Sequence, residues 1–287
     1  MRAVSVVDCH NELGEGPVWH PLERKLYWMD ILGKKIQRFD PRTGAYQSTP
    51  VDRQVSALGL RAVNSFITAG EDGFAFWDSE RNLFQPIGHP EAEKPDARFN
   101  DGKVDRAGRF WAGTMTTHDE SSTLYRLDTD LTITPVIPNL TISNGIGWSP
   151  DNRVMYHADT LRHTIFAYDF DHQSGTVSHK REFMRFSGHD GNPDGLTVDA
   201  YGNVWCAVWG GWRVECYSSS GKLKETVEVP VQQPSSCIFG GTNLALLFIT
   251  SAREGLSEQQ LEEQPQAGNL FQCLPVVHGL PEPRFAG

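Results

Sequence analysis

Short apolar runs alternate with turn residues along the chain, and one layout of runs and turns recurs. In residues 192–205 an acidic residue and a glycine precede an apolar run, a polar turn containing Gly202-Asn203 follows, and a second apolar run ends at Trp205. Short runs of apolar, β-branched and aromatic residues bounded by turn residues are typical of β-strands. Residues 192–205 are therefore predicted to form two strands joined by a turn.

Copies of this layout lie at residues 143–156 and 100–111, with a fainter copy at 15–28. Two further repeats complete the set, and the residues that precede the inner strand are Glu15, Ala57, Asp101, Asn144, Asp194 and Ser236. Successive members of this set are 42 to 50 residues apart. A period of about 40 to 50 residues with four short strands per repeat is the signature of a β-propeller blade. The repeats predict an all-β fold: one six-bladed β-propeller domain over residues 1–287, with four antiparallel strands per blade.

Two segments need a separate interpretation. Residues 3–7 form an apolar run with no blade of their own. We expect them to pair with the last repeat as its outermost strand and close the ring, which would remove an exposed strand edge. Residues 253–267, rich in Glu and Gln, lie within the sixth repeat. They are predicted to form a solvated loop with a turn or two of helix.

Charge and composition narrow the classes of partner. The net charge is −10 and the pI is about 5.4, which argues against nucleic-acid binding. No stretch approaches the roughly 18 apolar residues of a membrane span, and the N-terminus lacks a basic region followed by an apolar one. The sequence therefore predicts a soluble, cytoplasmic protein that binds neither nucleic acid nor membrane, and it carries no signal of oligomeric state.

The five cysteines are an odd number and show no CxxC spacing. Scattered cysteines of this kind are usually small buried apolar residues. Cys206 and Cys216 could face each other on neighbouring strands, but a structural disulfide would be out of keeping with a cytosolic protein.

The residues before the glycines carry the candidate chemistry. In a propeller the first strand of each blade lines the central channel, so Glu15, Asn144 and Asp194 should converge at its mouth, with Asn100 and Asp101 beside them. Two carboxylates and an amide carbonyl suit calcium, magnesium or manganese, and zinc also accepts carboxylate oxygen. The alternative is that Asp-Gly and Asn-Gly are ordinary turn pairs. The recurrence of such pairs opposite an acidic first copy favours a metal site.

Other catalytic patterns are weaker in this sequence. None of the ten histidines pair as HxH or HExxH, and no Gly-x-Ser-x-Gly nucleophile elbow occurs. Trp205, Trp209 and Trp212 could stack on a sugar ring, although packing between blades is the default explanation for such tryptophans.

Six motifs resemble those of one known family. They are Leu13-Gly14-Glu15-Gly16-Pro17-Val18-Trp19, Arg98-Phe99-Asn100-Asp101-Gly102-Lys103-Val104-Asp105, Gly113-Thr114-Met115, Ile142-Ser143-Asn144-Gly145, Pro193-Asp194-Gly195 and Phe239-Gly240-Gly241. In order and approximate spacing, over nearly the whole chain, they resemble the family of regucalcin (senescence marker protein) and gluconolactonase. The resemblance implies a six-bladed propeller that holds one divalent cation in the channel mouth and hydrolyses sugar-acid lactones.

The resemblance also implies roles for single residues. Glu15, Asn144 and Asp194 match the metal ligands of the family. Arg98 and Asn100 match residues that hold the substrate near the metal.

His118 marks a departure from the family pattern. It stands shortly after the Gly-Thr-Met motif, where animal members of the family have a glutamate. A substrate contact and an exposed loop histidine are both open for His118, and the departure favours a different sugar.

The expected reaction is metal-dependent hydrolysis of an aldonolactone, such as glucono-, xylono-, arabinono- or galactonolactone, to the aldonic acid. The cation (calcium, zinc, magnesium or manganese) would polarise the carbonyl and activate a water. Asp194 would bind the cation through one oxygen and accept the water's proton through the other. Two alternatives stay open: a non-catalytic calcium-binding propeller like regucalcin, and a paraoxonase-like esterase.

Overall fold

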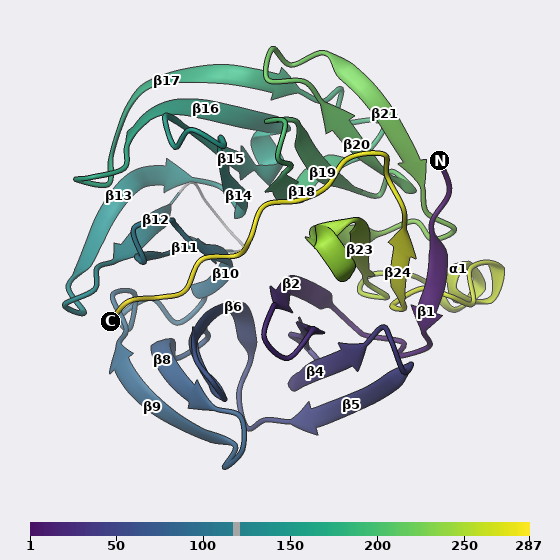
Figure 1. The fold of residues 1–287 in the computed structure, drawn as a ribbon, viewed down its shortest axis with the longest axis horizontal. Helices are drawn as coiled ribbons and strands as arrows, with labels where there is room; N and C mark the ends of the chain where they lie inside the picture. Colours follow the sequence, from purple (N-terminus) through teal and green to yellow (C-terminus); the bar gives the residue numbers. More distant parts are fainter. Residues whose placement is uncertain (117–120) are drawn as a thin grey trace.

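Six four-stranded antiparallel sheets surround a central axis in the computed structural model, which describes residues 1–116 and 121–287 (Figure 1). Successive sheets lie side by side around the ring, and we number the blades 1 to 6 in chain order. The first strands of neighbouring blades contact each other around the axis. The predicted six-bladed β-propeller is confirmed.

The blades are made of the following elements. Blade 1 contains β2 (Gly14–His20), β3 (Lys25–Asp30), β4 (Lys35–Asp40) and β5 (Ala45–Pro50). Blade 2 contains β6 (Val55–Ala62), β7 (Ser65–Gly70), β8 (Gly73–Asp78) and β9 (Leu83–Gly88). Blade 3 contains β10 (Arg98–Val104), β11 (Phe110–Met115), β12 (Ser122–Leu127) and β13 (Ile133–Leu140).

The second half of the ring follows the same plan. Blade 4 contains β14 (Ser143–Trp148), β15 (Val154–Asp159), the 3₁₀ turn η1 (Thr160–Arg162), β16 (Thr164–Asp171) and β17 (Thr176–Arg185). Blade 5 contains β18 (Asn192–Val198), β19 (Val204–Trp209), β20 (Arg213–Tyr217) and β21 (Leu223–Glu228). Blade 6 contains β22 (Pro234–Gly240), η2 (Thr242–Leu244), β23 (Leu246–Ser251), α1 (Glu258–Glu263), β24 (Leu270–Cys273) and β1 (Val4–Val7).

Blade 6 combines strands from both ends of the chain (Figure 1). β1 pairs antiparallel with β24, and Ser5 lies opposite Phe271. This pairing covers the outer edge of β24, which would otherwise present unpaired backbone groups. The expected outermost position of the N-terminal strand is therefore present in the structure.

The segment 253–267 contains only the short helix α1, as predicted for a solvated loop. Ser257 and Gln260 form a capping box at its start, in which the Ser257 side chain accepts the backbone N–H of Gln260. Within residues 1–116 and 121–287, no helix has the length and apolarity required to cross a membrane.

The five cysteines are free thiols, and all except Cys9 are buried. On the paired strands β19 and β20, Cys206 lies opposite Glu215, whereas Cys216 lies opposite Trp205. Cys206 and Cys216 therefore do not face each other across the strand pair, and the buried apolar role predicted for these cysteines agrees with their positions.

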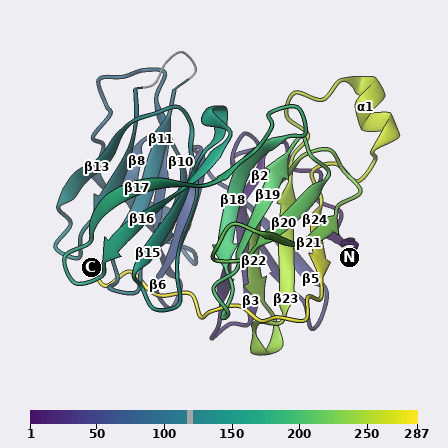
Figure 2. The ribbon, with the colours of Figure 1, turned by 90° about the horizontal axis from the view of Figure 1, so that it is seen from above.

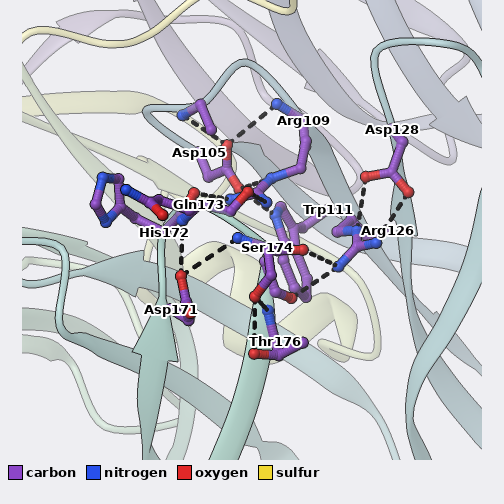
Figure 3. Close-up of polar contacts among 12 residues, drawn as sticks. Asp105, Arg109, Trp111, Arg126, Asp128, Asp171, His172, Gln173, Ser174 and Thr176 are labelled. Carbon is purple, nitrogen blue, oxygen red and sulfur yellow. Dashed lines mark hydrogen bonds and ion pairs between the residues drawn. The ribbon is translucent and has the colours of Figure 1, made fainter.

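An aspartate closes the first hairpin of blade 3 and also connects it to blade 4 (Figure 3). The Asp105 carboxylate accepts hydrogen bonds from Arg109 Nε at 2.7 Å and from the Trp111 indole at 2.9 Å. The Arg109 guanidinium continues outward and donates to the carbonyl of His172, in the turn between β16 and β17, at 2.8 Å. One buried ion pair therefore fixes both the hairpin and the spacing between two blades.

Blade 5 repeats this turn. Asp199 accepts hydrogen bonds from the Asn203 backbone N–H at 2.9 Å and from the Trp205 indole at 3.0 Å. Trp205 is 1% exposed and packs against Phe239 of blade 6. Packing between blades, rather than stacking on a sugar, is the role of this tryptophan.

Every first strand contains a register shift near its start. In β2 the shift follows Glu15, in β14 it follows Asn144, and in β18 it follows Pro193 and so includes Asp194. A bulge bends the strand and re-aims a side chain that regular pleating would place on a sheet face. The bulges therefore explain how the side chains of these residues can point away from the sheet faces.

The glycines after Asn144 and Asp194 lie inside strands, where the next blade approaches closely. A Cβ atom on Gly145 would lie 2.4 Å from the Asp194 carbonyl oxygen, and one on Gly195 would lie 2.0 Å from Ser236 Oγ. The Asn-Gly and Asp-Gly pairs are therefore not ordinary turn pairs. Glycine is required because neighbouring first strands pack backbone against backbone.

The segment 274–287, which we call the C-terminal strap, crosses the ring on the face opposite α1 (Figure 2). It bonds to the turns at the far ends of the first strands: Ala200 donates its N–H to the His278 carbonyl, and Ala286 donates to the Gly108 carbonyl. Glu282 of the strap also approaches Lys103 of β10 to 3.8 Å. The strap therefore covers the channel at the end away from the strand starts.

Candidate functional site

The starts of β2, β14 and β18 bring together the predicted ligand residues. Glu15, Asn144 and Asp194 are 8%, 7% and 4% exposed. Each belongs to a different blade, and the electrostatic field of Glu15 acts on Asp194. Residues 15, 144 and 194 are thus buried polar groups around one end of the channel.

Burial and mutual repulsion dominate the electrostatics of the carboxylates. Burial, and next the charge of Asp101, raise the pKa of Glu15 to about 8. Burial, and next the charges of Glu15 and Asp101, raise the pKa of Asp194 well above its ordinary value. Groups of like charge in a place with little water favour their protonated forms. A cation between them would relieve this cost.

Asp101 joins this group from β10, and burial raises its pKa to about 6. Its place in the blade differs from the expected one. Regular pairing resumes at Gly102, Ile146 and Leu196, so Asn100, two residues earlier in blade 3, corresponds to Asn144 and Asp194. By this pairing Asp101 lies one residue after the position of Asp194, but its charge acts on both Glu15 and Asp194, so the expected convergence of these carboxylates is present.

Two oxygen atoms at the site are buried and accept no hydrogen bond. They are Asn144 Oδ1 and Asp194 Oδ1. Buried polar atoms are almost always paired, and an unpaired one points to a missing water, ion or catalytic role. Carboxylate and amide oxygens are ligands for hard divalent cations. The residues present therefore fit such a cation.

The donor set of the site is oxygen-rich and mixed. Among the described residues, no three His, Cys, Asp or Glu side chains form a group that could hold a metal ion. The candidate set has two carboxylates, and the amide oxygen of Asn144 is its third member. An oxygen set of this kind favours calcium, magnesium or manganese over a thiolate-bound or imidazole-bound metal.

Arg98 and Asn100 form a small network beside the ligand residues. Arg98 Nη1 donates to Asn100 Oδ1 at 3.0 Å and to the Phe99 carbonyl at 2.9 Å. Asn100 Nδ2 donates to the Ser143 carbonyl at 3.0 Å. The network connects blade 3 to the residue before Asn144.

The charge of Arg98 is balanced by residues from other blades. Burial lowers the pKa of the Arg98 guanidinium, whereas the negative charges of Glu254, Glu15 and Glu71 raise it. Glu254, which follows β23, was not predicted as part of the site. It lies in the segment interpreted as a solvated loop, and no motif around it marks its proximity to Arg98.

A serine and a histidine near the site resemble a nucleophile and its base. Ser143 Oγ lies 2.7 Å from His157 Nε2. Both residues are fully buried, at 1% and 0% exposed, and burial lowers the pKa of His157 to about 3. A Cβ on Gly113 would lie 1.7 Å from Ser143 Oγ. The hydroxyl is therefore packed against blade 3 and is closed to a substrate.

Of the remaining predicted residues, His118 lies outside the described residues 1–116 and 121–287. Thr160 was not singled out from the sequence, yet its hydroxyl bonds to Asn144. The only signal was a hydroxyl residue directly after the end of β15, which is a common pattern for a turn.

The sequence is similar to that of several known proteins. Residues 13–253 match the family model of the SMP-30/Gluconolactonase/LRE-like region. A 6-deoxy-6-sulfogluconolactonase of Pseudomonas putida is 37% identical over 279 residues, which cover 96% of this chain and 95% of that protein. Regucalcin of Gallus gallus is 35% identical over 284 residues, covering 96% and 95%.

The fold has a near match among solved structures. The crystal structure of regucalcin from Agrobacterium tumefaciens, described as a calcium-binding protein, superposes with a TM-score of 0.94 at 27% identity. The match covers 99% of this chain and 97% of that one.

Proposed function

The chain belongs to the SMP-30/gluconolactonase/LRE-like family, and from this we propose that it hydrolyses the ring ester of a sugar-acid lactone with the help of one divalent cation. Glu15, Asn144 and Asp194 would hold the cation. The observation that carries the proposal is the pair of buried oxygens without hydrogen bonds, Asn144 Oδ1 and Asp194 Oδ1. They come from two blades, and the charges of Glu15 and Asp101 act on Asp194.

A bound divalent cation supplies Lewis acidity for the lactone carbonyl, charge for the developing oxyanion and a lowered pKa for water. The chain's own residues then supply the proton transfer. The oxygen of water bonds to the lactone carbonyl carbon, and the water's proton passes to a carboxylate oxygen of Asp194. The ring C–O bond breaks, and its oxygen takes that proton back. The product is an open-chain sugar acid with a free hydroxyl.

The pKa of Asp194 determines whether its carboxylate is ionised and how strong a base it is. Without a cation, burial and neighbouring carboxylates raise the pKa of Asp194. Positive charge beside the carboxylate lowers its pKa, so Asp194 is ionised and able to accept a proton when the site is loaded. It is then a weak base, and its contribution comes mainly from its position next to the water.

Arg98 and Asn100 would orient the substrate. The Arg98 guanidinium is a planar donor suited to ring or hydroxyl oxygens. Its bond to Asn100 Oδ1 holds the amide in place, and the amide oxygen has a second lone pair for a sugar hydroxyl. His118, which lies outside the described residues, stays a predicted substrate contact.

The class of substrate follows from this chemistry. A site rich in carboxylates, amides and a guanidinium matches the hydroxyls of a sugar better than the apolar groups of an aryl ester. We therefore expect five- and six-carbon aldonolactones, such as glucono-, xylono-, arabinono- and galactonolactone.

The test is acid release, followed with a pH indicator, from a panel of aldonolactones. The protein is first stripped with a chelator and then reloaded separately with calcium, magnesium, manganese or zinc. We expect acid release that stops with chelator and returns with one or more cations. Metal binding without turnover would indicate a calcium-binding propeller, and a preference for aryl esters would indicate an esterase. Either result would contradict the proposed reaction.

A further inference from the structure

Thr160, the first residue of η1, contacts the candidate ligand Asn144 and also Pro193, the residue before the candidate ligand Asp194. Asn144 Nδ2 donates to Thr160 Oγ1 at 3.1 Å, and Thr160 Oγ1 donates to the Pro193 carbonyl at 2.9 Å. All three groups are buried. One hydroxyl therefore connects blade 4 to the residue before Asp194 in blade 5.

The hydroxyl has a single proton, and the bonding pattern fixes where it goes. A carbonyl oxygen is only an acceptor, so the proton of Thr160 must point to Pro193. The Thr160 oxygen can then only accept from Asn144, which requires the NH₂ group of the amide on that side. The Asn144 amide consequently has one favourable orientation, with Oδ1 turned away from Thr160.

The opposite orientation of the amide is penalised. It would place Asn144 Oδ1 against Thr160 Oγ1, two acceptors with no proton between them. The NH₂ group would also lose its bond to Thr160 Oγ1. A buried acceptor without a hydrogen-bond donor carries the cost of its lost hydration, and this cost keeps the amide in the orientation in which its NH₂ group bonds to Thr160.

The threonine itself is held by its surroundings. The Thr160 backbone N–H donates to the Ile142 carbonyl at 3.2 Å, and its carbonyl accepts from the His163 N–H at 2.9 Å. Thr160 is 8% exposed. Its hydroxyl is therefore a fixed point rather than a mobile surface group.

We infer that Thr160 is a positioning residue of the cation site: its hydroxyl turns Asn144 Oδ1 toward the cation and fixes the backbone before Asp194. This inference rests on the proposed cation site. Groups that orient metal ligands in this way change metal affinity by about 10- to 100-fold when they are removed.

The test compares Thr160→Val with Thr160→Ser. Valine keeps the shape of threonine and removes the hydroxyl, whereas serine keeps the hydroxyl. Chelator-stripped proteins are titrated with calcium, manganese and zinc salts alone in a calorimeter. We expect the Kd of the tightest cation to rise about 10- to 100-fold in Thr160→Val and to stay near the wild-type value in Thr160→Ser.

Thr164→Val is the matched control. Thr164 is also buried, and its hydroxyl donates to the Arg162 carbonyl at 2.7 Å in the same turn. This change removes a buried hydroxyl that contacts neither Asn144 nor Pro193. We expect it to lower the metal-free thermal midpoint and to leave the cation Kd unchanged.

The outcomes separate the inference from the proposed function. A Thr160→Val protein that loses thermal stability but keeps the wild-type Kd would show that the hydroxyl only supports the fold, and the inference would be overturned. A wild-type protein that binds cation but hydrolyses no lactone would refute the proposed reaction while the affinity series still decides the role of Thr160. A wild-type protein that binds no cation would overturn both.

Discussion

Asp194 combines a proposed catalytic role with a cost to stability. Its carboxylate is buried, and burial together with the charges of Glu15 and Asp101 raises its pKa. Asparagine at this position would keep the size of the side chain and remove both the negative charge and the proton acceptor. Stability and activity should therefore respond to this change in opposite directions.

For Asp194→Asn we expect lactonase turnover to fall by about 10²- to 10⁴-fold, the usual contribution of a general base. The metal-free protein should unfold at the same temperature as wild type or higher, because a repelled buried charge is gone. Turnover in the indicator assay and thermal unfolding in chelator provide the two measurements. Near-native turnover with cation present would refute the assignment of Asp194.

Glu15 makes the metal-free protein sensitive to pH. Its pKa is raised from 4.5 to about 8, so the folded state holds this proton more tightly than the unfolded chain. Between these values the folded state binds more protons, and the free energy of unfolding falls as the pH rises. We expect the thermal midpoint of chelator-treated protein to decrease from pH 5 to pH 8 by this linkage.

Glu15→Gln identifies the group responsible for this slope. The variant cannot titrate at position 15, so its midpoint should vary less with pH in chelator. A saturating cation should also flatten the wild-type curve, because it binds and stabilises the ionised carboxylates. Equal slopes for wild type and Glu15→Gln in chelator would exclude Glu15 as the source.

At the scale of the strand, the bulges in the first strands allow residues from different repeats to contribute to one candidate site. A regular strand alternates its side chains between two faces, and both faces of a first strand pack against neighbouring blades. The shift after Glu15 and the shift after Asn144 free these side chains to turn toward the axis. The register shift is thus as important to the site as the residue types.

Gly145 tests the close packing of β14 and β18. A Cβ at this position would lie 2.4 Å from the Asp194 carbonyl oxygen and 2.8 Å from the Leu196 nitrogen, both backbone atoms. We expect Gly145→Ala to lower the free energy of unfolding by about 1–3 kcal/mol and to weaken cation binding, because Asp194 must move. Denaturant unfolding and calorimetric titration measure the two effects.

Gly88→Ala is the comparison for Gly145→Ala. Its Cβ would meet only the tip of the Ile133 side chain at 2.8 Å, which can rotate away. A smaller loss of stability and an unchanged cation Kd are expected. If both alanine variants weaken cation binding equally, backbone contact at Gly145 is not the cause.

The repeats made the blades predictable, because each apolar run and turn is encoded locally. The same local signals could not place Asp101 and Asn100 in the correct register, since the position of a bulge depends on pairing with the neighbouring strand. The orientation of Asn144 was also hidden in the sequence. It depends on a bond to Thr160, on a different element of blade 4, and no spacing rule predicts a side-chain bond between elements.

At the scale of the whole molecule, the two ends of the channel serve different purposes. The candidate ligands lie at the starts of the first strands, and the C-terminal strap covers the opposite ends. Phe285 of the strap is 3% exposed, its N–H donates to the Leu60 carbonyl at 2.7 Å, and its ring lies 6.1 Å from that of Phe76. The strap therefore ties blade 2 to the rest of the ring, a contact that the repeat pattern did not predict.

Phe285→Ala separates stability from cation binding. Removing a buried aromatic side chain costs about 3–5 kcal/mol, so the variant should unfold at a clearly lower denaturant concentration. The proposed cation site lies at the other end of the strands, and effects at distant, independent sites are additive within about 0.5 kcal/mol. The cation Kd should consequently stay near the wild-type value under conditions in which the variant is folded. A large rise in Kd would instead mean that the strap sets the spacing of the first strands, and the two ends of the channel would then have to be treated as one coupled unit.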